Sequence, residues 1–136
     1  MRRLLPLLLA SLLSACALPP LPERRPDMAW VDLFTRTGKL VMAESLDRER
    51  LNDGRYFQVT PGEHELIIRF DYEISYGLNW TDPQNRTCYL RVPYKDFKAG
   101  AHYRLEGRVL GIEPEARLYD SNDQIVATDN RESCIF

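Results

Sequence analysis

The chain has 136 residues, which is enough for one domain, and it carries a net charge of −2. Its mixed-sign, mildly acidic composition provides no electrostatic basis for binding nucleic acid. The hydrophobic content of 44% suits a packed core, so we expect disorder only near the N-terminus.

Residues 1–15 are typical of an export signal. Arg2 and Arg3 form a short basic region, and the apolar run at residues 4–13 is too short for the roughly 20 residues that cross a membrane. The strongly apolar run, with no polar residue before the arginine pair, favours the general secretory route over twin-arginine export. Losing this segment removes two arginines and takes the net charge from −2 to about −4.

The four residues Leu13, Ser14, Ala15 and Cys16 resemble the lipobox of bacterial lipoproteins. Small side chains before the cysteine let the backbone enter a protease cleft, and the thiol is the nucleophile that takes up diacylglycerol. The resemblance implies cleavage before Cys16 and acylation of its sulfur and its new amine. Several acyl chains give a stable membrane anchor. An ordinary secreted protein with a chance cysteine is the alternative.

The residue after the lipidated cysteine is Ala17. In lipoproteins an Asp at this place tends to retain the protein in the inner membrane. The resemblance therefore implies the periplasmic face of the outer membrane, ahead of the inner membrane or the cell surface.

A proline-rich linker follows, so that residues 16–27 comprise the lipidated cysteine and this linker. Its four prolines favour extended polyproline II structure and oppose helix or sheet. Fully extended, residues 17–27 would span roughly 34 Å at about 3.1 Å per residue. We expect the linker to hold the folded domain off the membrane; a disordered leader without a spacing role is the alternative.

Residues 28–136 predict one β domain. The clearest pattern is the alternation from His64 to Ile74, which places the even-numbered residues on one buried face of a long strand. Pro61 and Gly62 predict a turn just before it, and residues 55–59 read as its hairpin partner.

Further strands are predicted at residues 29–34, 39–43, 87–92, 103–110, 116–119 and 125–128. Residues 43–51 are compatible with one or two helical turns, residues 121–123 predict the turn of a last hairpin, and Pro93 is expected to end its strand or lie on an edge. No helix is long enough for a parallel crossover, so we predict an all-β fold, a single antiparallel β-sandwich of about seven or eight short strands.

Residues 30–34, followed by residues 53–66, resemble small β-sandwich modules of the PEGA and carboxypeptidase-regulatory-like kind. These modules carry a strand, a hairpin with a Pro-Gly turn, and then a long strand. Together with the lipobox, the chain is similar to small outer-membrane lipoproteins of unknown function with one such ectodomain. Residues 43–52 replace the shorter connection of a typical module, so the topology stays open.

Two cysteines remain after Cys16, namely Cys88 and Cys134. In an oxidising compartment they predict one disulfide that pins the C-terminal tail to the sheet. Closing so long a loop stabilises by roughly 4 kcal/mol in the chain-entropy model. Two free thiols are the alternative.

Catalytic and metal-binding patterns are missing from the sequence. His64 and His102 stand alone, without an H-x-x-x-H, C-x-x-C or G-x-S-x-G motif, and the carboxylate pairs Glu63/Glu65 and Glu113/Glu115 read as solvated surface. We therefore expect no enzyme activity, no cofactor and no metal.

The candidate binding loop is residues 76–85, in which Tyr76, Asn79 and Trp80 combine aromatic rings with an amide. Such side chains suit sugar stacking or a protein contact, unless Trp80 folds back over the core. We expect a non-catalytic binding or structural module of the cell envelope, whose partner is another envelope protein. The alternative is a glycan or peptidoglycan binder that uses Tyr76 and Trp80.

Overall fold

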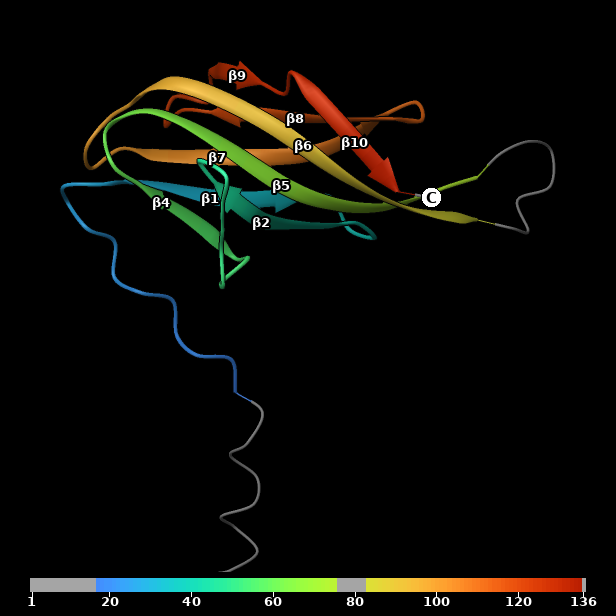
Figure 1. Cartoon of the computed structure of the whole chain (residues 1–136), viewed down its shortest axis with the longest axis horizontal. Coiled ribbons are helices and arrows are strands. Elements are labelled where there is room, and N and C mark those ends of the chain that lie inside the picture. The colour runs from blue at the N-terminus through green and yellow to red at the C-terminus, as the bar shows by residue number, and fades with distance from the viewer. Residues whose placement is uncertain (1–16, 76–82, 136) are drawn as a thin grey trace, which may run out of the picture.

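The computed structural model describes residues 17–75 and 83–135. This part of the chain is all β and contains no helix. Figure 1 shows the linker leaving the domain at the end where β1 begins, with the C-terminus at the opposite end. The strands are β1 (Ala29–Thr35), β2 (Leu40–Leu46), β3 (Glu49–Arg50), β4 (Tyr56–Val59), β5 (Gly62–Ile74), β6 (Gln84–Phe97), β7 (His102–Leu110), β8 (Glu113–Tyr119), β9 (Ile125–Thr128) and β10 (Arg131–Ile135).

These strands form two five-stranded sheets. Sheet A has the order β4-β1-β7-β8-β9, and sheet B has the order β10-β6-β5-β2-β3. The expectation of purely antiparallel pairing is wrong at one place, because β1 runs parallel to β7. Parallel neighbours need a long connection, and here the whole β2–β6 segment supplies it.

The long strand expected from the alternation is confirmed in β5. The side chains of its inward face, Leu66, Ile68, Phe70, Tyr72 and Ile74, are all buried. They join buried residues of both sheets in one hydrophobic cluster. Burial of one face is the physical reason why a period of two specifies a strand and its register.

The predicted hairpin between residues 55–59 and β5 is wrong. The strand β4 pairs with β1 of sheet A, whereas β5 pairs with β2 and β6 of sheet B. The Pro61-Gly62 turn therefore links the two sheets, with Gly62 at a φ of 108° that favours glycine.

The helical turns allowed for residues 43–51 are also absent. This segment forms the end of β2, a bulge between Ala43 and Ser45, and a tight turn into β3. Its local helix propensity is overridden, because β2 gains a full ladder with β5 and buries Ala43 and Ser45.

Pro93 lies inside β6, a strand with neighbours on both sides. The carbonyl of Arg91 bonds Asn130 N at the side facing β10, and β10 extends no further along β6 than this residue. Backbone groups of residues two apart in a strand point to the same side, so the N–H that Pro93 lacks would point to the side of β10, beyond the end of that strand. No hydrogen bond of the ladder is therefore lost. Pro93 is thus at a local edge, as expected, without ending its strand.

The predicted disulfide is confirmed. Cys134 of β10 lies directly opposite Cys88 of β6, and their sulfurs are bonded at 2.02 Å. Cys88 is fully buried, so the disulfide faces the core and attaches the C-terminal strand to sheet B.

Candidate functional site

Four of the predicted functional residues lie outside the described part of the chain. These are Cys16 and the binding-loop residues Tyr76, Asn79 and Trp80. The described residues instead show three other features with chemical potential: a linker docked on sheet A, a cleft at one end of the domain, and a hollow on sheet B.

The linker contacts sheet A through both backbone and side chains. The N–H of Arg25 donates to the side-chain oxygen of Gln58 on β4, at 3.0 Å. Arg55 donates to the carbonyl of Pro19, at 2.8 Å. The linker is therefore without strand structure, as predicted, but it is bound to the domain at two separate points.

Trp30 is the centre of this contact. It lies on the outer face of sheet A and yet is only 4% exposed. Its indole stacks on Tyr56, and the guanidinium of Arg24 lies over the ring at 5.2 Å from the centroid. A cation over an indole is attractive, so Arg24 covers a buried ring that lies outside the hydrophobic cluster of the two sheets.

Asp32 connects this aromatic stack to β7. Its carboxylate accepts from Trp30 Nε1 at 2.8 Å and from His102 Nε2 at 2.7 Å. Arg24 donates to the other ring nitrogen of His102, at 3.1 Å. This arrangement requires the neutral ring with its proton on Nε2. The nitrogen that would act as a base is occupied by Arg24, so the Asp–His pair has no position open for a nucleophile.

We call these four residues, Arg24, Trp30, Asp32 and His102, the linker clasp. Sequence reasoning missed it, because Asp32 and His102 lie 70 residues apart and meet only through the parallel pairing of β1 and β7. The local signal was an arginine pair in the linker shortly before a tryptophan.

His64 also has an aspartate partner. Its Nδ1 lies 2.5 Å from a carboxylate oxygen of Asp47, and its Nε2 lies 2.7 Å from the carbonyl oxygen of Thr60. Burial by itself would raise the pKa of Asp47, but the N–H of Glu65 and the His64 ring outweigh it and lower that pKa. This contact holds the β2–β3 turn against the start of β5.

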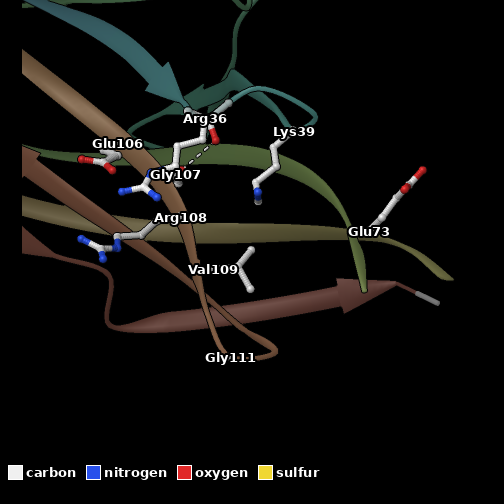
Figure 2. Close-up of a pocket in the computed structure, with 9 residues that line it drawn as sticks. Arg36, Lys39, Glu73, Glu106, Gly107, Arg108, Val109 and Gly111 are labelled. Atoms are coloured by element: carbon white, nitrogen blue, oxygen red, sulfur yellow. Dashed lines mark hydrogen bonds between the residues drawn. The ribbon is translucent and has the colours of Figure 1, made fainter. Parts of the chain in front are cut away.

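The end cleft has a volume of about 320 Å³ and lies between the β1–β2 connection and the β7–β8 turn. Figure 2 shows Arg36 and Lys39 on one side, Gly111 on the other, and Glu73 turned away from both cations. Arg108 forms an ion pair of 3.6 Å with Glu115. Three cations and two carboxylates line this cleft, so its charge favours no single class of ligand.

The hollow lies on the outer face of sheet B and has a volume of about 360 Å³. It is lined by Glu44, Ser45, Arg48, Arg50, Ile67, Tyr89, Arg91 and Ser133. Three guanidinium groups and one carboxylate surround an apolar and aromatic floor. Two carboxylates expected to be solvated surface are in ion pairs: Glu65 lies 3.5 Å from Arg91 of the hollow, and Glu115 lies 2.8 Å from Arg117 on sheet A.

No group of three or more His, Cys, Asp or Glu residues within 17–75 and 83–135 is placed to hold a metal ion. Within the same ranges, no helix is long and apolar enough to span a membrane. No family model, curated protein or solved structure matches the chain.

Proposed function

We propose that the chain is a bacterial lipoprotein, cleaved before Cys16 and lipidated on that residue, whose ectodomain is a non-catalytic binding module on the periplasmic face of the outer membrane. The support is the lipobox-like sequence followed at once by a linker that docks on the folded domain. A disulfide is also typical of proteins outside the cytoplasm.

The linker clasp is the observation that carries the binding role. Arg24 is eight residues from Cys16, a reach of at most about 25 Å in extended polyproline II form. Docking of this linker covers part of sheet A and leaves the outer face of sheet B free. An anchored domain with one covered face and one free face suits the presentation of a binding surface.

We further propose that the two sheets form a β-sandwich of the PEGA-like kind. Side chains of both sheets belong to one buried cluster, and Phe70 of sheet B packs so close to Gly107 of sheet A that a Cβ there would stand 2.9 Å from the ring. Two sheets packed face to face bury their alternating apolar residues in this way.

Lipid labelling and membrane fractionation test the anchor. Cells that express the wild-type chain should incorporate labelled palmitate into it and retain it in the outer-membrane fraction, while Cys16→Ser should lose both. Ala17→Asp, which keeps the lipid, should move the protein to the inner-membrane fraction. An unlabelled wild-type chain, or a Cys16→Ser chain that fractionates unchanged, contradicts the anchor.

In vivo crosslinking tests the binding role. A stoichiometric envelope protein crosslinked to the wild-type chain supports the protein-binding proposal. Retention on purified peptidoglycan, lost in Trp80→Ala, would favour the alternative glycan-binding role instead. Turnover of an envelope substrate, abolished by a single carboxylate or histidine change, contradicts both.

A further inference from the structure

The hollow on sheet B is built by one cross-strand row and its neighbour. Four directly paired residues, Arg50, Ser45, Ile67 and Arg91, run across β3, β2, β5 and β6. In the next row Tyr89 lies opposite Ser133 of β10. Short serine side chains between long arginine and tyrosine side chains leave a depression in this face of the sheet.

Arg48 stands at the rim of this hollow in an unusual backbone conformation. Asp47 and Arg48 form the β2–β3 turn with φ values of 51° and 71°, where Asn-Gly is the preferred pair. Asp47 is compensated by its bonds to His64 and to the N–H of Glu65. Arg48 makes no such contact within the described residues, so a long side chain stands here at a strained φ without local compensation.

The three arginines are weakly paired within the described part of the chain. Arg48 has no ion pair or hydrogen bond there, and Arg50 is 3.7 Å from Glu44 with its side chain 83% exposed. Arg91 reaches Glu65 only at 3.5 Å. The hollow therefore has loosely paired guanidinium groups around an apolar floor of Ile67 and Tyr89.

Guanidinium groups match carboxylates, which they bind with two parallel hydrogen bonds. A neutral sugar would need amide or acidic side chains that form hydrogen bonds with its hydroxyl groups. Glu44 is the single such residue in the lining of the hollow. A volume of about 360 Å³ is at the small end of ligand sites and accommodates one or two side chains. These properties favour a short acidic peptide segment over a glycan.

We propose that this hollow binds a segment of a partner protein in which Asp or Glu alternates with aliphatic residues. Arg48, Arg50 and Arg91 hold the carboxylates, and Ile67 and Tyr89 contact the aliphatic side chains. The site rests on the proposed binding role of the ectodomain and names the chemistry of its partner. It does not depend on the lipid anchor, so peptide binding is measurable without a membrane.

The test is calorimetric titration of the full chain, purified in detergent, with an end-blocked heptapeptide of alternating leucine and glutamate. The matched probe has glutamine in place of glutamate. We expect the glutamate peptide to bind, with an affinity that falls as salt is raised. Arg91→Gln and Arg48→Gly should each weaken binding about tenfold, because each removes a charge-assisted contact.

Arg48→Gly separates binding from folding, since glycine relieves the positive φ and should leave the thermal midpoint equal or higher. Arg104→Gln is the control on sheet A, where Arg104 pairs with Asp123, and it should leave peptide affinity unchanged. Equal affinity for the glutamine peptide, no binding of the glutamate peptide, or unchanged affinity in both arginine variants overturns the proposal. Binding of soluble peptidoglycan fragments in its place also overturns it, and none of these outcomes bears on the lipid anchor.

Discussion

The indole of Trp30 lies parallel to the ring of Tyr56, with 4.5 Å between their centroids and 5° between their planes. This stack stands on the outer face of sheet A, and the guanidinium of Arg24 lies above the Trp30 ring. The docked linker therefore contributes to the burial of Trp30.

Replacing Arg24 should uncover Trp30. In a Trp80→Phe background, which leaves one tryptophan, Arg24→Ala should increase acrylamide quenching of Trp30 fluorescence and cost about 0.5–1 kcal/mol of stability. Glu23→Gln, in the neighbouring linker position, should change neither. Identical quenching with and without Arg24 would show that the linker does not cover the ring.

Asp32→Ala should destabilise the domain by about 1–2 kcal/mol in urea unfolding. The change leaves the Trp30 and His102 donors without their shared acceptor, and unpartnered donors in a partly buried site are costly. Glu106→Ala, on the same sheet face, is the matched control, with an expected effect within about 0.5 kcal/mol. Equal losses in the two variants would argue against the clasp.

Removing the disulfide should loosen the C-terminal strand. Cys88→Ala combined with Cys134→Ala should lower the free energy of unfolding by about 2–4 kcal/mol, and hydrogen exchange should quicken in β10. Reductant should lower the free energy of unfolding of the wild-type chain to nearly that of the variant, and it should leave the value of the variant unchanged. A variant that is still sensitive to reductant would be inconsistent with this bond as the cause.

Gly107→Ala tests the packing of the two sheets. A Cβ at this position would stand 2.9 Å from Cδ2 of Phe70, so the core must shift at a cost of about 1–3 kcal/mol. Phe70→Leu in the same chain should recover part of that loss, since it removes the clashing ring edge. Additive losses in the double variant would mean that the two residues do not touch.

Asp47→Asn should destabilise the domain at neutral pH, by roughly 0.5–1 kcal/mol for a solvent-screened pair. The pKa of Asp47 is lowered in the folded chain, so its carboxylate stabilises the fold above the ordinary value of 3.8. That contribution is lost as the pH falls through the lower pKa of the folded state. The wild-type and variant unfolding curves should therefore converge below pH 3.8. Glu49→Gln is the control, and a difference that persists in strong acid would contradict the assignment.

The sequence by itself determined the strand content and the disulfide. Alternation from His64 to Ile74 specified a strand, because only one face of a two-residue period can be buried, and two remaining cysteines had one possible bond. All eight predicted strands are present, and the two that were missed, β3 and β10, are short edge strands with little pattern of their own.

Only the tertiary structure decided which strands pair and which side chains meet. The pairing of β4 with β1, and of β1 with β7, joins segments that are far apart in the sequence, which local patterns do not encode. The same holds for the linker clasp and for the arginines around the hollow. These groups come together from distant segments because backbone ladders align them, and so their chemistry appears only once both sheets are formed.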